Sequence, residues 1–402
     1  MTTSDEAAVA GVSLGAVEAE IRYPDRRDLV ALRLAPGTKA AAVFTRNAFC
    51  AAPVQLAREH LQRCSGRPRL ILVNTGNANA GTGAPGLAAA RECCARAAAL
   101  AGVEIEEVLP FSTGVIGEDL PVARITDALP DLMAACSSEG WEDASWGILT
   151  TDTRPKLAER RFEVDGKSYR LKGMAKGAGM LRPNMATMLA FLVSDIAIDR
   201  DLLQELLGTA VDRSFHRITV DGDTSTNDAV LLAATGAAGN GNCSAGSELA
   251  QAFAEALASL CLELAQGLVR DGEGASRFVA VEVSGGATPL ECLDVAFTVA
   301  HSPLVKTALF AGDPNWGRIL AAVGRAPIDD LDVNAVRIRL GGLPIAEGGA
   351  RSPDYDEARV AEVMAGKELS LEVDLGRGSA RDTVWTSDFS YDYVRINAEY
   401  RS

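Results

Sequence analysis

The chain has 402 residues, of which 48% are hydrophobic and 23% are charged, as is usual for a globular protein with a sizeable core. Its length favours two or three domains. The net charge of −15, without any cluster of Lys or Arg, argues against binding to nucleic acid or to an anionic membrane surface, because both need a basic patch.

The cysteines and the N-terminus bear on the cellular compartment. None of the eight cysteines forms a CxxC pair, so we expect free thiols in a reducing cytoplasm. Residues 1–6 lack the basic region and apolar run of a signal peptide. The apolar runs are judged too short for a transmembrane helix, which needs about 18 apolar residues.

Hydrophobic periodicity predicts an alternation of strands and helices in the first part of the chain. The predicted elements are strands at 28–34, 40–45 and 69–73 and helices at 53–64, 86–101 and 121–136. A polar loop at 74–85 follows the continuous apolar run 69–73. Loops that follow buried strands often line functional sites, so we expect this one to do so.

The second part of the chain has a more mixed pattern. Residues 162–171 read as a hairpin with Asp165-Gly166 at its turn. The other predicted elements are helices that begin at Asp199 and Ser247, helices at 303–310 and 316–323, and strands at 277–284, 336–340, 369–375 and 394–397. The pattern predicts a mixed α/β fold with a smaller C-terminal unit.

The stretch from Lys176 to Leu189 combines two glycines and a proline with a threonine, Thr187, that directly precedes an apolar run at 188–193. It contains no His, Cys, Asp or Glu. A threonine at the mouth of a buried strand is placed as an N-terminal nucleophile would be after chain cleavage. The alternative is a loop that merely enters a core strand.

A threonine hydroxyl is a weak nucleophile and needs a base. The three histidines carry no catalytic or metal-binding spacing, and we interpret them as structural or exposed. Cleavage between Ala186 and Thr187 would instead free an α-amine with a pKa of about 7.7–8.0 beside the hydroxyl. That amine can accept the hydroxyl proton, directly or through water.

Several other sites are excluded by their spacing. Gly166-Lys167-Ser168 ends like a phosphate-binding loop, but Arg161 stands where the first glycine is required. The loop that begins at Asp221 resembles a calcium loop for three positions and lacks the required glycine and glutamate. No GxGxxG dinucleotide motif is present. The Thr/Asp/Asn-rich loop at 221–228 is better interpreted as a hydrogen-bonded wall near the site.

Two motifs, Lys176-Gly-Ala-Gly-Met180 and Pro183-Asn-Met-Ala-Thr-Met-Leu189, resemble the self-cleavage motif of the ornithine acetyltransferase family. This family comprises the bifunctional glutamate N-acetyltransferases of arginine biosynthesis. The blocks that match in the same order are 73–80, 112–117, 150–153, 217–228, 313–318 and 391–397. The resemblance therefore covers nearly the whole chain.

The resemblance implies specific roles for site residues. Cleavage falls between Ala186 and Thr187, Thr187 is the nucleophile, and Thr113 with Gly114 forms the oxyanion site. The implied substrate-binding residues are Thr150 (or its neighbour Thr151), Lys176, Thr187, Glu273, Asn397 and Ser402. Taken alone, Thr113-Gly114 is equally a turn at a strand end, Lys176 a solvated loop lysine, and Glu273 a turn acid.

The resemblance also implies an α/β sandwich with helices packed on sheets. Residues 1–186 would form one chain after cleavage and 187–402 the other, with 187–280 completing the sandwich and 281–402 forming a smaller domain. Two copies of each chain would assemble as a heterotetramer.

The implied reaction moves acetyl from N2-acetyl-L-ornithine to Thr187 and then to L-glutamate. No metal or organic cofactor is implied, and acetyl-CoA is a further donor in some members. Two alternatives stay open: a self-processing amidohydrolase or aminopeptidase, and a binding protein with a decayed site.

Overall fold

The computed structural model describes residues 8–182, 188–241 and 243–399, which form two compact units. Of these residues, unit 1 comprises 8–177, 188–216, 224–241 and 243–268, and unit 2 comprises 178–182, 217–223 and 269–399. The two short early segments of unit 2 are joined by a bond from Val220 N–H to the Leu181 carbonyl (2.9 Å). The structure thus divides the chain near residue 268, whereas the sequence-based boundary lies at 280. The expected cleavage point, 186/187, lies outside the described residues.

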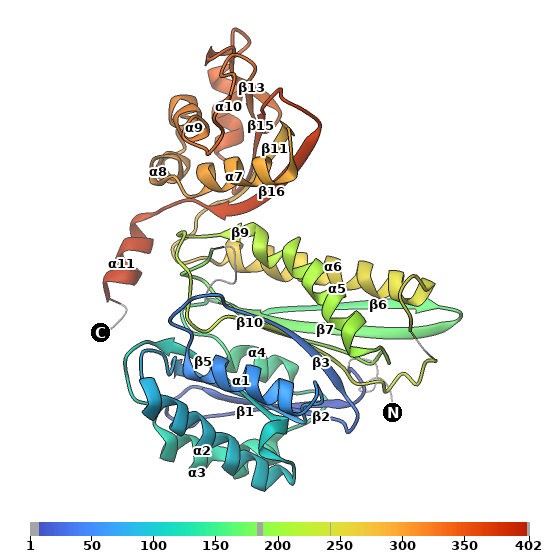
Figure 1. The fold of residues 1–402 in the computed structure, drawn as a ribbon. Coiled ribbons are helices and arrows are strands. Elements are labelled where there is room, and N and C mark those ends of the chain that lie inside the picture. The colour runs from blue at the N-terminus through green and yellow to red at the C-terminus, as the bar shows by residue number, and fades with distance from the viewer. Residues whose placement is uncertain (1–7, 183–187, 242, 400–402) are drawn as a thin grey trace, which may run out of the picture. The chain divides into compact units, whose positions relative to one another are not determined.

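Unit 1 contains two sheets (Figure 1). The first has the order β1 (Val12–Val17), β2 (Leu29–Leu34), β4 (Leu70–Asn77), β5 (Val108–Val115). The second has the order β3 (Lys39–Phe44), β10 (Ala229–Ala234), β8 (Leu189–Ser194), β7 (Lys167–Lys176), β6 (Lys156–Val164). Two of these pairs, β4 with β5 and β8 with β10, are parallel.

The main core of unit 1 lies between these sheets. Phe111 of β5 meets Phe191 of β8 edge to face, with ring centroids 5.1 Å apart, inside one apolar cluster drawn from both sheets. Every residue of β8 and β10 is buried, which agrees with strands covered on both faces. The expected mixed α/β sandwich is therefore confirmed.

Helices cover the outer faces of both sheets (Figure 1). The first sheet packs against α1, α2 and α3 through a second apolar cluster, and α4 adds to the core between the sheets. The helices of unit 1 are α1 (Ala52–Arg63), α2 (Gly83–Ala101), α3 (Val122–Ala135), α4 (Trp141–Gly147), α5 (Arg200–Asp212) and α6 (Glu248–Arg270). Leu260 and Leu264 of α6 pack over Gly173 of β7, whose missing side chain leaves them room.

The helix α6 is long and apolar enough, by length and composition, to cross a membrane, contrary to the expectation from the sequence. Half of its most apolar window is buried, and Phe253, Leu257 and Leu260 on one face are fully buried. Such one-sided burial is the pattern of a core helix.

Unit 2 is built on one sheet with the order β14-β13-β12-β15-β11-β16-β9. Its strands are β9 (Ile218–Thr219), β11 (Phe278–Gly286), β12 (Arg337–Leu340), β13 (Leu343–Glu347), β14 (Ala350–Arg351), β15 (Glu368–Asp374) and β16 (Ala380–Ser387). Its helices are α7 (Pro289–Ala300), α8 (Pro303–Ala311), α9 (Trp316–Val323), α10 (Glu357–Met364) and α11 (Tyr391–Glu399). The strands β11 and β15 and the helices α7 and α9 contribute to a single apolar core.

One predicted element is wrong. Residues 394–397 were expected to be a strand, but they lie inside the helix α11. A four-residue alternation of apolar and polar residues cannot separate a strand from a short helix. Contacts at helical spacing decide the outcome, because Arg395 pairs with Asp392 at 2.9 Å and Asn397 Nδ2 donates to the Tyr393 carbonyl at 3.0 Å. The expectation of free thiols is confirmed, since all eight cysteines are unbridged.

Candidate active site

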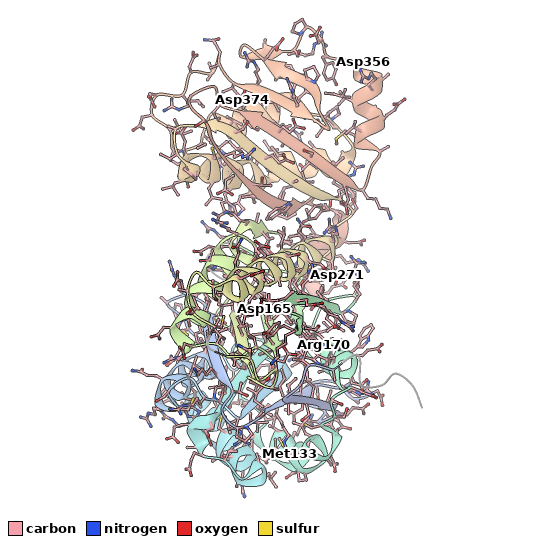
Figure 2. All side chains as sticks on the ribbon, turned by 90° about the vertical axis from the view of Figure 1, so that its right-hand side faces the viewer. Met133, Asp165, Arg170, Asp271, Asp356 and Asp374 are labelled. Atoms are coloured by element: carbon pink, nitrogen blue, oxygen red, sulfur yellow. The ribbon has the colours of Figure 1, made fainter. Side chains whose placement is uncertain are left out.

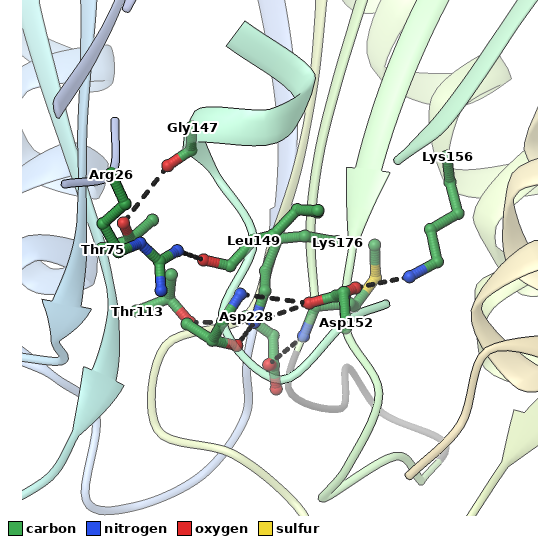
Figure 3. Close-up of polar contacts among 12 residues, drawn as sticks. Arg26, Thr75, Thr113, Gly147, Leu149, Asp152, Lys156, Lys176 and Asp228 are labelled. Carbon is green, nitrogen blue, oxygen red and sulfur yellow. Dashed lines mark hydrogen bonds and ion pairs between the residues drawn. The ribbon is translucent and has the colours of Figure 1, made fainter. Parts of the chain in front are cut away.

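Lys176 is the centre of a buried polar cluster in unit 1 (Figure 3). It ends β7, and only 2% of its side chain is exposed. Its Nζ donates to the hydroxyl of Thr150 at 2.7 Å and to the hydroxyl of Thr113 at 3.1 Å. Three residues that lie far apart in the sequence, and that the sequence assigned to the site, are therefore in direct contact.

Asp152 balances the buried positive charge. Its Oδ2 lies 3.8 Å from Lys176 Nζ, and its Oδ1 accepts hydrogen bonds from Lys156 Nζ (2.6 Å) and the Gly177 N–H (2.7 Å). Burial alone would raise the pKa of Asp152, but the charges of Lys176 and Lys156, together with the hydrogen bonds from Gly177 and Lys156, hold the pKa below its usual range. Asp152 is therefore an anion that keeps two buried ammonium groups in place.

The loop that carries Thr150 and Asp152 follows α4 and is held at its start by backbone contacts. The Arg26 guanidinium donates to the Leu149 carbonyl at 2.6 Å, and the Thr75 hydroxyl donates to the Gly147 carbonyl at 3.2 Å. Figure 3 shows these bonds beside the Lys176 cluster. Because Thr75 lies on β4, its bond ties the start of this loop to the first sheet.

Gly114, next to Thr113 on β5, needs to be glycine. Its φ is +137°, and a Cβ built there would lie 2.2 Å from the backbone carbonyl carbon of Gly76 on β4. The pairing of β4 with β5 becomes irregular at this level. The close approach turns the backbone at the end of β5, next to the Thr113 hydroxyl that Lys176 contacts.

Asp228 lies directly before β10 and is fully buried. Its Oδ1 accepts a hydrogen bond from the Met188 N–H at 2.9 Å. Burial raises its pKa to about 8, against the opposing effects of that bond, the Ser225 hydroxyl and the Lys176 charge. A carboxylic acid that is largely neutral near pH 7 thus contacts the residue that follows Thr187.

Two further predicted residues, Glu273 and Asn397, lie in unit 2. Asn397 Nδ2 on α11 donates to Glu273 Oε2 at 2.8 Å, and Glu273 is buried. Gly179 leaves room for the carboxylate, since a Cβ there would lie 2.5 Å from Glu273 Oε2. Two residues that the sequence assigned to substrate binding therefore form one polar pair.

Asp221 and Tyr393 extend this pair within unit 2. Asp221 accepts the Met180 N–H at 2.6 Å and the Leu181 N–H at 3.0 Å, and its Oδ2 lies 3.4 Å from the Tyr393 hydroxyl. Burial raises the pKa of Asp221, and the charges of Asp223 and Glu273 add to the effect. These contacts hold the backbone of Met180, the last residue of the Lys176–Met180 motif, and of Leu181.

Some sequence-based assignments cannot be located. Ala186, Thr187 and Ser402 lie outside the described residues. Within the described part of the chain, no group of three or more His, Cys, Asp or Glu side chains is arranged to hold a metal ion. The histidines have other partners: His60 contacts the Val108 carbonyl and His301 the Thr219 hydroxyl.

Sequence reasoning missed three charged residues: Asp152, Lys156 and Asp228. Asp152 lies inside the matched block 150–153 and Asp228 ends the block 217–228, so the resemblance could have pointed to both acids. A useful signal was the acid placed directly before an apolar strand, as Asp228 is. Lys156 carried no such signal, because its burial arises only from packing.

Comparison with known proteins gives long matches. Residues 13–402 match the model of the ArgJ family. The arginine biosynthesis bifunctional protein ArgJ of Pseudomonas fluorescens (strain Pf0-1) is 53% identical over 395 residues, which cover 98% of this chain and 97% of that protein.

Two solved structures also match. The arginine biosynthesis bifunctional protein ArgJ of Bacillus halodurans is 36% identical, with 52% of this chain and 98% of that chain covered and a TM-score of 0.50. The ornithine acetyltransferase of Mycobacterium tuberculosis, complexed with ornithine, is 31% identical, with 44% of this chain and 93% of that chain covered and a TM-score of 0.39.

Asp152→Asn should lower the free energy of unfolding by about 3 kcal/mol or more, because it removes the buried carboxylate that lies against the ammonium groups of Lys156 and Lys176. Asp165→Asn is the matched control, since Asp165 is exposed at the β6–β7 turn (Figure 2) and should change stability by less than about 0.5 kcal/mol. Denaturant unfolding measures both. Equal stability of the two variants would show that Asp152 is not the counter-ion.

The contribution of Asp228 to stability should fall as pH rises from about 4 to about 8. In the unfolded chain Asp228 has the usual aspartate pKa of about 3.9 and loses its proton near that pH. The folded chain keeps the proton until about pH 8. Asp228→Asn cannot release this proton, so its thermal midpoint should fall less between pH 5 and pH 8, each value being approximate. Identical pH dependence in both proteins would contradict the raised pKa.

Proposed function

Because the chain belongs to the ArgJ family, we propose that it transfers acetyl groups by way of a covalent ester on Thr187. It is a bifunctional acyltransferase of arginine biosynthesis with ornithine acetyltransferase activity, so the family and activity expected from the sequence motifs are confirmed. What we propose in addition is the role of each residue and the route of the acetyl group.

The observation that carries the residue roles is the pair of bonds from Lys176 to Thr113 and Thr150. An ammonium group only donates hydrogen bonds, so both hydroxyl oxygens act as acceptors toward it. Their own O–H hydrogens are then available to other acceptors. This arrangement supports Thr113, with the Gly114 backbone, as the donor pair for an oxyanion.

We propose that the enzyme first cuts its own chain. Thr187 Oγ attacks the carbonyl carbon of Ala186, the C–N bond breaks, the nitrogen takes the hydroxyl proton, and water opens the resulting ester. The products are chains 1–186 and 187–402, which we propose stay together and pair into a heterotetramer of two copies of each. The freed α-amine, with a pKa of about 7.7–8.0, then serves as the base.

Acetyl transfer follows in two half-reactions. Thr187 Oγ attacks the acetyl carbon of N2-acetyl-L-ornithine while its proton passes through the α-amine to the leaving nitrogen of ornithine. The amine of L-glutamate then attacks the ester carbonyl carbon, the bond from that carbon to Thr187 Oγ breaks, and a proton from the attacking amine returns to Thr187 Oγ through the α-amine. Acetyl-CoA is a further candidate donor for the first step. We place the enzyme in the cytoplasm, where its free thiols are stable.

The two amino-acid substrates share an α-carboxylate and an α-nitrogen but differ in the charge of the side chain. A fixed cation can hold the shared carboxylate of both, and the buried Lys176 ammonium is our candidate. The Glu273 carboxylate suits the ammonium group of ornithine and would repel the side chain of glutamate. Asn397, bonded to Glu273, is proposed to orient that carboxylate, and Ser402 is kept as a further substrate contact.

Self-cleavage is tested on a denaturing gel with N-terminal sequencing. The protein should run as chains 1–186 and 187–402, with Thr187 at the new N-terminus. Thr187→Ala should remain one chain, because it lacks the hydroxyl that attacks Ala186. Thr126→Ala, which removes the hydroxyl of a half-buried threonine on α3, is the control and should be cut normally. Normal cutting of Thr187→Ala would remove Thr187 from the mechanism.

The two half-reactions separate the charged substrate contacts. Lys176→Ala should slow both acetylation by acetylornithine and deacetylation by glutamate, whereas Glu273→Ala should slow the ornithine half-reaction more. A hydrogen bond to a charged group is worth about 1.5–3 kcal/mol, so each loss should be roughly ten- to a hundredfold in kcat/KM.

Single-turnover kinetics measures each half-reaction, with Lys167→Ala at the start of β7 as the control for Lys176. Equal losses in both steps for Glu273→Ala would overturn its assignment to the ornithine side chain. Steady release of acetate in the absence of glutamate would instead identify a hydrolase.

A further inference from the structure

The parallel strands β8 and β10 begin side by side, and Asp228 joins them at that point. Leu189 pairs with Ala229, so Met188 and Asp228 are the residues directly before each strand. Met188 is held twice: its N–H donates to Asp228 Oδ1 at 2.9 Å, and its carbonyl accepts the Ala229 N–H at 3.2 Å. The nitrogen held by Asp228 belongs to the peptide group that joins Thr187 to Met188.

The second carboxyl oxygen of Asp228, Oδ2, is buried. Oδ2 makes no hydrogen bond that meets geometric criteria with any described residue. Burying a polar atom in this way costs free energy, so its position calls for a reason. The charged and titratable groups that face Asp228 are Lys176, which favours its ionised form, and Cys50, whose pKa is raised by burial and further by Asp228.

We propose that Asp228 is a positioning residue for the reaction at Thr187: it holds the backbone N–H of Met188, the residue that follows Thr187, while its own carboxyl is in the neutral, protonated form. The proposal rests on the function proposed above and extends it by one residue. Asp228 acts through the Met188 N–H, and no bond to Asp228 forms or breaks in the reaction.

The neutral form matters for an electrostatic reason. Acyl transfer passes through a tetrahedral intermediate that carries a negative charge on the former carbonyl oxygen. An ionised Asp228 would add a second buried negative charge one peptide group away from the nucleophilic residue, and like charges at close range repel strongly where water is absent. The protonated carboxyl accepts the same Met188 N–H without adding that charge.

The prediction concerns the pH dependence of acetyl transfer. Asp228→Asn keeps an acceptor oxygen for the Met188 N–H and mimics the neutral acid at every pH. The ratio of kcat for Asp228→Asn to kcat for the wild type cancels the titration of groups that both proteins share. With a pKa of about 8, that ratio should rise roughly thirtyfold between about pH 6.5 and about pH 9.5.

Two further variants make the test specific. Asp228→Ala removes the acceptor, and we expect a loss of about ten- to a hundredfold in kcat that Asp228→Asn largely restores at pH near 7. Asp195→Asn is the matched control. Asp195 directly follows β8, at the opposite end of the strand from Met188, and its buried carboxyl also accepts a backbone N–H, that of Arg170, at 2.9 Å. Its kcat ratio to the wild type should stay flat with pH.

Each outcome has a distinct meaning. A flat ratio for Asp228→Asn, or full kcat in a folded Asp228→Ala, overturns the proposal; if Asp228→Ala does not fold, the Asp228→Asn ratio decides alone. The mass of chain 187–402 from the wild type, measured after mixing with acetylornithine alone, tests the proposed function separately. An added acetyl group together with a flat ratio refutes only the role of Asp228, whereas the absence of acetyl refutes the covalent mechanism itself.

Discussion

The ion cluster around Lys176 is the interaction on which the proposed site in unit 1 depends. An ammonium group with 2% of its side chain exposed is stable only if an anion and hydrogen-bond acceptors surround it. Asp152 supplies the anion, and Thr113 and Thr150 supply the acceptors. Because the Lys176 hydrogen bonds have directions, this one charge also orients two hydroxyl groups from two separate segments of the chain.

The sandwich places these groups at the strand ends that border the core. Thr113 and Gly114 come from β5 in one sheet, while Lys176 ends β7 in the other. The parallel pair β8–β10 brings Asp228 beside Met188 on the sheet that carries Lys176. A fold built from two sheets with helices outside thus gathers polar side chains where the strands begin or end, and keeps the space between the sheets apolar.

The charge states in unit 1 illustrate how position decides chemistry. Asp152 and Asp228 are both buried aspartates near Lys176. Two lysine charges and the hydrogen bonds to Asp152 together lower its pKa despite burial, whereas burial dominates at Asp228 and raises its pKa to about 8. One carboxyl is therefore an anion that holds a cation, and the other is an acid that is largely neutral near pH 7.

The amino-acid sequence by itself determined the local elements, the free thiols and the family. Helix positions such as α1 and α9 follow from local periodicity, and the motif around Thr187 carries the family because its residues are adjacent in the chain. Only the tertiary structure decided that Asp152, Lys156 and Asp228 surround the site and that residues 394–397 are helical. Burial and long-range pairing have no local pattern, since they depend on which distant segments the packed sheets bring together.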